Sequence, residues 1–82
     1  MPLLSEQIRA GRNLIRMTQE DLSTRSGVPL STVKRIESNR GPASGKHSTV
    51  DALRAALEDA GVEFTNGDQP GVRLAPGARS TS

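Results

Sequence analysis

The sequence predicts a mainly α-helical domain of four helices followed by a short C-terminal β-hairpin. Apolar residues recur at helical spacing in successive segments before Gly61, and residue types that cap or end helices stand between these segments. After Gly61 the apolar period changes to two. We therefore expect one compact helical domain over residues 1–61, a hairpin extension over residues 62–75 and a disordered tail over residues 76–82.

The first helix is expected to run from about Glu6 to Arg16, with Ser5 as its N-cap. Glu6 would lie favourably near the positive end of the helix. One face carries residues at helical spacing, and Leu14 and Met17 widen it; the set is Ile8, Gly11, Arg12 and Ile15.

The second helix is expected to begin after Thr18 and to end near Ser26. Thr18 can cap it, and Asp21 three residues later gives a weak version of the capping box. Gly27 suits the left-handed exit that ends many helices, and Pro29 restarts the chain with a fixed backbone dihedral.

The third helix is expected from about Leu30 to Ser38, and the glycines and proline between Asn39 and His47 predict a loop. Ser48 can cap the fourth helix, which Gly61 ends. Its inner stripe consists of Val50, Leu53, Leu57 and Ala60.

Two short alternating segments follow the helices, one around Val62 and Phe64 and one around Val72 and Leu74. The turn-rich residues between them complete the pattern of a β-hairpin. An isolated two-stranded hairpin is marginally stable in water, so its apolar face must lie on the helices or pair with another subunit. The hairpin is thus a candidate dimer element.

The second and third helices have the spacing of a helix-turn-helix. Two short helices that cross steeply need buried anchors, a small residue and a tight turn, and the chain supplies Leu22, Ser23, Gly27, Val28, Val33 and Ile36. Arg12 and Glu37 also project toward this predicted core. Because a lone buried charge is costly, we predict an Arg12–Glu37 bridge that locks the first helix to the third. In the alternative interpretation both side chains reach solvent.

The stretch from Ile8 to Glu37, IRAGRNLIRMTQEDLSTRSGVPLSTVKRIE, resembles the lambda-repressor/Cro-like (XRE-type) family of bacterial and phage regulators. The resemblance spans roughly residues 5–60. It implies a four-helix DNA-binding domain whose third helix enters the major groove, with Arg12 and Glu37 bridging helices. The chain departs from the family pattern at Ser23, usually alanine, at Pro29, usually Ser or Thr, and in having a hairpin where a fifth helix is common. The usual dimer interface therefore cannot be transferred.

The outer face of the third helix carries the predicted base-reading residues Leu30, Ser31, Lys34 and Arg35. Arg35 can donate two hydrogen bonds to guanine, Ser31 can bond several bases, and Leu30 can pack on a thymine methyl group. Lys34 could instead meet a phosphate or stay solvated. The predicted phosphate contacts come from the start of the second helix and from residues flanking the third, namely Thr18, Gln19, Thr32, Asn39, Arg40 and Lys46. Arg9, Arg16 and Arg25 are interpreted as ordinary surface arginines.

The formal net charge is +2, and the basic surplus lies in the N-terminal half. Residues 1–40 hold seven Lys or Arg against four Asp or Glu, whereas residues 41–82 hold four against five. This asymmetry is compatible with a polyanionic partner, although ordinary surface charge would also explain it.

Composition argues against an enzyme and against a cofactor or metal. The chain has no cysteine and a single histidine, His47, and shows no pairing of a nucleophile with a base. Neither a signal peptide nor an apolar run of membrane-spanning length is evident, so the expected location is the cytoplasm, on the nucleoid, without a membrane partner.

Together these features predict a sequence-specific regulator, in the first instance a repressor, that binds a double-stranded DNA operator as a homodimer. Related half-sites would be spaced about one DNA turn, roughly 10 base pairs. The alternative from another class is an antitoxin or protein-binding adaptor built on the same helical fold.

Overall fold

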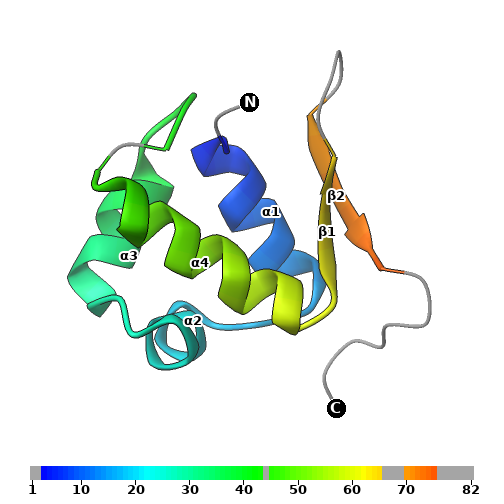
Figure 1. Cartoon of the computed structure of the whole chain (residues 1–82), viewed down its shortest axis with the longest axis horizontal. Coiled ribbons are helices and arrows are strands. Elements are labelled where there is room, and N and C mark those ends of the chain that lie inside the picture. Colours follow the sequence, from blue (N-terminus) through cyan, green and yellow to red (C-terminus); the bar gives the residue numbers. More distant parts are fainter. Residues whose placement is uncertain (1–2, 44, 66–69, 76–82) are drawn as a thin grey trace.

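The computed structural model describes residues 3–43, 45–65 and 70–75. In these residues it contains four helices and a two-stranded antiparallel sheet, so the mainly α-helical fold with a C-terminal hairpin is confirmed (Figure 1). The elements are α1 (Ser5–Leu14), α2 (Gln19–Ser26), α3 (Leu30–Ser38), α4 (His47–Asp59), β1 (Val62–Thr65) and β2 (Gly71–Leu74). The expected tail, residues 76–82, lies outside the described residues.

Helix α1 begins and ends earlier than the sequence pattern predicts. The N-cap is Leu4, so the prediction that Ser5 caps the helix is wrong; Ser5 is its first residue and is fully buried. The Gln7 side chain provides the cap, because its Oε1 accepts the Leu4 N–H at 2.9 Å. The helix ends at Leu14 because Arg16 turns into the left-handed region at φ 57°, which an L-residue adopts only at a cost.

The chain before α1 pairs with the loop after α3. The Ser5 N–H donates to the Gly41 carbonyl and the Ala43 N–H donates to the Leu3 carbonyl, both at 2.8 Å, on either side of an antiparallel bridge between Leu4 and Pro42. This pairing fixes where α1 starts, and it involves residues almost forty positions apart.

The two helices of the helix-turn-helix form as the sequence predicts. Thr18 Oγ1 accepts the Asp21 N–H at 3.0 Å, and Gly27 leaves α2 in the left-handed conformation at φ 77°. Pro29, at φ −56°, precedes α3. Ser23 is half-buried and donates its hydroxyl to the Val28 carbonyl at 2.6 Å, which ties the turn to α2.

Helix α4 begins at His47, directly after Lys46, and no side chain caps it, so the prediction of a Ser48 cap is wrong. The Lys46 carbonyl accepts the N–H groups of Thr49 and Val50 in the first turn. Leu53 and Leu57 of the predicted inner stripe are fully buried, and Val50 and Ala60 pack against the core from its border.

One core joins the four helices to the hairpin. Strands β1 and β2 pair with Val62 opposite Leu74 and Phe64 opposite Val72, and Val62 and Phe64 are buried against α1 and α4. The sequence predicts that the apolar face of the hairpin lies either on the helices or on another subunit, and the structure shows it on the helices. Gly11 allows the close approach, because a Cβ atom there would lie 3.1 Å from Val62 Cγ1.

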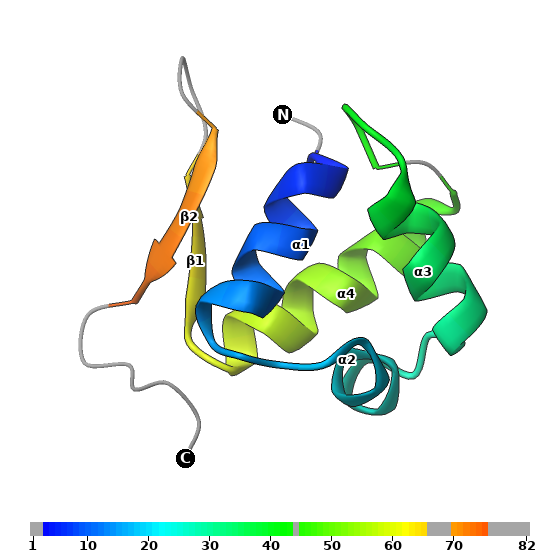
Figure 2. The same ribbon diagram turned by 180° about the vertical axis from the view of Figure 1, so that it is seen from behind.

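The hairpin and α3 lie on opposite sides of α1, as both views show (Figures 1 and 2). Gln7 fastens the hairpin to α1, since its Nε2 donates to the carbonyls of Thr65 at 3.0 Å and Gly71 at 3.1 Å. Within the described ranges, no helix combines the length and apolar character needed to cross a bilayer.

Candidate nucleic-acid interface

Helix α3 divides into a buried face and an exposed face. Val33, Ile36 and Glu37 are buried toward α1 and α2. At 100° per residue, the direction opposite these three residues is occupied by Ser31 and Arg35, with Lys34 beside them, and all three are exposed. Leu30, the fourth residue predicted to read bases, is half-buried at the first turn. The four side chains thus form one outward row with Leu30 at its border.

The buried face of α3 is held by a bidentate ion pair with α1. Arg12 Nε lies 2.8 Å from Glu37 Oε2, and Arg12 Nη2 lies 2.9 Å from Glu37 Oε1. The side chains of Arg12 and Glu37 are 15% and 3% exposed. Two parallel hydrogen bonds in a nearly dry site fix the distance and the rotation of α3 relative to α1.

Three further contacts converge on this ion pair. Arg12 Nη1 donates to the Met17 carbonyl at 2.9 Å, and Gln19 Nε2 donates to Glu37 Oε1 at 3.2 Å. Arg9 Nη1 donates to the backbone carbonyl of Glu37. A cation at the C-terminal end of a helix is electrostatically favourable.

The sequence predicts that Arg9 is an ordinary surface arginine, and this prediction is wrong, because the Arg9 guanidinium holds the end of α3. Arg9 stands three residues before Arg12, which places both guanidinium groups on one side of α1. This spacing is the sequence signal that could have indicated a structural role for Arg9.

The predicted phosphate-binding residues occupy two places. Thr18 and Gln19 stand at the start of α2, where the first-turn N–H groups and the positive helix end point outward. The Gln19 amide group is turned toward Glu37, so its backbone N–H is the group available to a phosphate. Thr32 is half-buried within α3. The other three predicted residues are exposed and follow α3 in the chain: Asn39, Arg40 and Lys46.

A carboxylate supports the loop that carries Arg40. Glu6 Oε1 accepts the Gly41 N–H at 2.9 Å. Hydrogen bonds from the backbone N–H groups of Glu6 and Gly41 hold the pKa of the Glu6 carboxyl below its ordinary value, and the positive charges of Arg9 and Arg40 lower this pKa further. Glu6 is therefore ionised at neutral pH, and it anchors the loop next to the exposed end of α3.

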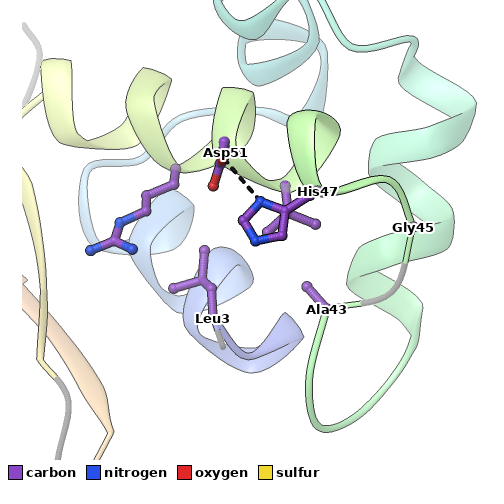
Figure 3. Close-up of a pocket in the computed structure, with 7 residues that line it drawn as sticks. Leu3, Ala43, Gly45, His47 and Asp51 are labelled. Atoms are coloured by element: carbon purple, nitrogen blue, oxygen red, sulfur yellow. Dashed lines mark hydrogen bonds and ion pairs between the residues drawn. The ribbon is translucent and has the colours of Figure 1, made fainter. Parts of the chain in front are cut away.

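A separate pocket of about 230 Å³ lies beside the start of α4 (Figure 3). Its described lining includes His47, whose Nδ1 lies 3.2 Å from Asp51 Oδ2 on the next turn, together with Leu3 and Ala43. The His47 side chain is almost fully exposed. Among the lining residues that the structure describes, none carries a hydroxyl, thiol or amine beside this imidazole. The pair therefore gives no sign of nucleophilic chemistry in the described part of the pocket.

Comparison with known families identifies the family to which this fold belongs. The profile of the helix-turn-helix family matches residues 8–48, half of the chain, from the second turn of α1 to the start of α4. The chain belongs to this family, of the XRE type. It is therefore a helix-turn-helix DNA-binding regulator, and α2 and α3 are the two helices that give the family its name. The matched segment stops before the hairpin, and no curated protein matches the chain.

Proposed function

We propose that this helix-turn-helix protein is a sequence-specific repressor that reads an operator in the cytoplasm, on the nucleoid. The observation that carries the proposal is the outward row on α3, three exposed polar or basic side chains on a helix fixed from behind by the buried Arg12–Glu37 pair. A rigid helix that presents donors outward can place them against base edges in the major groove.

Within this proposal each residue of the row has a separate role. Arg35 donates two hydrogen bonds to guanine O6 and N7, Ser31 bonds a base edge, and Leu30 packs on a thymine methyl group. Lys34 contacts a base or the adjoining phosphate. The positions of Thr18 and Gln19 at the start of α2, and of Arg40 and Lys46 after α3, suit contacts to the two flanking phosphate strands.

A single row of this length reads only a few base pairs, so the proposal includes a homodimer. Two copies related by a two-fold axis would read two related half-sites about one DNA turn apart, roughly 10 base pairs. Binding at a promoter would then exclude polymerase, without a need for chemistry by the protein.

Selection of bound duplexes from a random pool tests specificity, symmetry and spacing together. The selected duplex and a scrambled duplex are then titrated at several salt concentrations, and equal affinity for both at every salt concentration would refute specific reading. Transcription from a template whose promoter overlaps the selected site should fall as protein is added; a rise would identify an activator instead.

Two variants separate base reading from phosphate contact. Arg35→Ala should lose about 1–3 kcal/mol of discrimination at one base pair per half-site. Arg25→Ala, which removes the same charge from the exposed end of α2, should leave the base preference unchanged. Arg40→Ala should weaken all duplexes alike, because the contact that it would remove is to a phosphate, which carries no base identity.

A further inference from the structure

We propose that the edge of β2 facing away from β1, which pairs with no other strand among the described residues, is the homodimer interface, and that its occupant is β2 of a second copy of this chain. The two strands pair antiparallel around Val72 and extend the hairpin into a four-stranded sheet. The inference rests on the proposed function, which requires two copies of α3, and it assigns the surface that joins the two copies of the chain.

The backbone of β2 has hydrogen-bonding groups directed away from β1. The Ala75 N–H donates to the Gly61 carbonyl at 2.8 Å, and these two residues continue the register in which Val62 faces Leu74. In an antiparallel ladder, hydrogen-bonded and non-hydrogen-bonded pairs alternate. Arg73 and Gly71 therefore bond to β1, whereas the N–H and carbonyl groups of Val72 and Leu74 point outward from the sheet. Such a strand edge is a template for another strand.

The two large apolar side chains that are exposed in the described part of the chain lie at this same end of the hairpin. Leu74, at the end of β2, is 39% exposed, and Leu14, at the end of α1, is 40% exposed. Gln7 and Gly11 face the hairpin from α1, and Leu14 follows them at helical spacing. Helix α1 contacts β2, and both views place the end of α1 at the same end of the hairpin as the end of β2 (Figures 1 and 2). Pairing along β2 would bring the second copy against this apolar end.

The charge of Arg73 disfavours one register of this pairing, and a register centred on Val72 avoids it. With Val72 opposite Val72 of the second copy, Arg73 lies opposite Gly71, and no like charges face each other. A register centred on Arg73 would instead place two guanidinium groups opposite one another, which is destabilising. Pro70, opposite Leu74 in the favoured register, lacks an N–H and so ends the pairing there. The strand is thus complementary to itself around Val72.

This pairing also points both reading helices to one side. The two-fold axis that relates antiparallel strands of one continuous sheet is perpendicular to that sheet. Helix α3 lies beyond α1 on one face of the sheet, so the rotation leaves both copies of α3 on that face (Figures 1 and 2).

The absence of cysteine in this chain permits a register-specific cross-linking test. Residues opposite each other in a hydrogen-bonded antiparallel pair have Cα atoms about 5.5 Å apart, within disulfide range. Under mild oxidation, Val72→Cys should therefore give a covalent dimer of twice 8.7 kDa. Arg73→Cys is the matched control: its side chain is more exposed, but the two copies of position 73 would be diagonal neighbours, about 7–8 Å apart, and should cross-link poorly. Equal cross-linking of both variants, or none of Val72→Cys, would overturn the pairing.

Sedimentation equilibrium of the full chain gives the second readout. The wild-type chain should be a dimer, and Leu74→Lys should raise the dimer dissociation constant by about tenfold or more, because two charges would enter the interface. Ala55→Lys, on the exposed side of α4, adds the same charge and should not change the constant. Circular dichroism checks that each variant is folded. A monomeric wild-type chain, or a dimer that Leu74→Lys leaves intact, would overturn the interface.

DNA binding separates the failure of this interface from failure of the proposed function. If the interface is right, the Leu74→Lys variant should bind a duplex with one half-site with the same sequence preference as the wild-type chain. It should lose the additional affinity that the wild-type chain has for a duplex with two half-sites. Specific DNA binding by a chain that does not cross-link at Val72 would reject the interface alone. Cross-linking at Val72 without sequence preference would reject the operator-reading function alone.

Discussion

Replacing Arg12 with alanine tests whether the buried ion pair holds α3 in place. The substitution removes both guanidinium donors from the Glu37 carboxylate, whose side chain is 3% exposed, and also the donor to the Met17 carbonyl. Glu37 keeps the Gln19 amide at 3.2 Å, but an amide does not balance its charge. A nearly dry carboxylate would therefore be left without its counter-charge.

The expected loss follows from that geometry. Breaking a buried ion pair by removing one partner costs about 3–5 kcal/mol. Arg12 is 15% exposed, so water can partly replace it, and the Gln19 donor remains. We therefore expect the lower end, about 3 kcal/mol, which for a domain of this size lowers the melting temperature by roughly 12–24 °C.

Urea unfolding followed by circular dichroism measures this loss in the free energy of unfolding. Arg54→Ala is the matched control, because Arg54 forms an exposed pair with Glu58 at 3.2 Å within α4. Such a pair contributes about 0.5 kcal/mol or less. The double change Arg12→Met with Glu37→Leu should recover most of the stability, because no unpaired charge stays buried. If Arg12→Ala loses no more stability than Arg54→Ala, the pair does not hold α3.

Three further predictions concern α1. Ser5→Ala should raise the free energy of unfolding by about 1 kcal/mol in a urea titration. The reason is that the fully buried Ser5 hydroxyl has no hydrogen-bond partner in the described structure. A loss of stability would reveal such a partner. Gln7→Leu should cost about 2 kcal/mol and speed amide exchange in the hairpin more than in α2, because two hairpin carbonyls and the Leu4 N–H lose their partner; uniform exchange would contradict the clamp. The folded pKa of Glu6 is lowered, so its contribution to stability is complete above the unfolded value, about 4.3, and disappears as pH falls through the folded value. Glu6→Gln should reduce the fall in unfolding free energy that the wild-type chain shows at acidic pH. If this fall is the same in both proteins, Glu6 is not its source.

Much of the helix-turn-helix could be predicted from sequence because its signals are local. The Thr18 cap, the Gly27 exit and the proline before α3 each act within a few residues, and α3 has the predicted bounds. The outward row on α3 is what remains once Val33 and Ile36 turn inward, so the same spacing that predicts the core also predicts this surface.

The misplaced features depend on contacts between distant parts of the chain. Ser5 stands where a local rule expects a cap, but pairing of the N-terminal segment with Gly41 begins the helix one residue earlier. Gln7 bonds to the Thr65 carbonyl, 58 residues away, and Arg9 bonds to the Glu37 carbonyl, 28 residues away. No periodicity within α1 distinguishes Gln7 from a solvated side chain, and the spacing of Arg9 and Arg12 indicates a shared side of α1 but not the carbonyl group that Arg9 bonds. The orientation of the Gln19 amide likewise depends on Glu37, on another helix.

The separation of the two faces of α3 bears on how such a protein could acquire a new target. Ser31, Lys34 and Arg35 point outward, whereas the contacts that hold the helix come from Val33, Ile36 and Glu37. Under the proposed function, exchanging the three outer side chains should therefore change the preferred DNA sequence while folding stays intact, since surface substitutions usually alter stability by no more than about 0.5 kcal/mol. Divergent descendants of one such gene could thus come to control different promoters with the same scaffold.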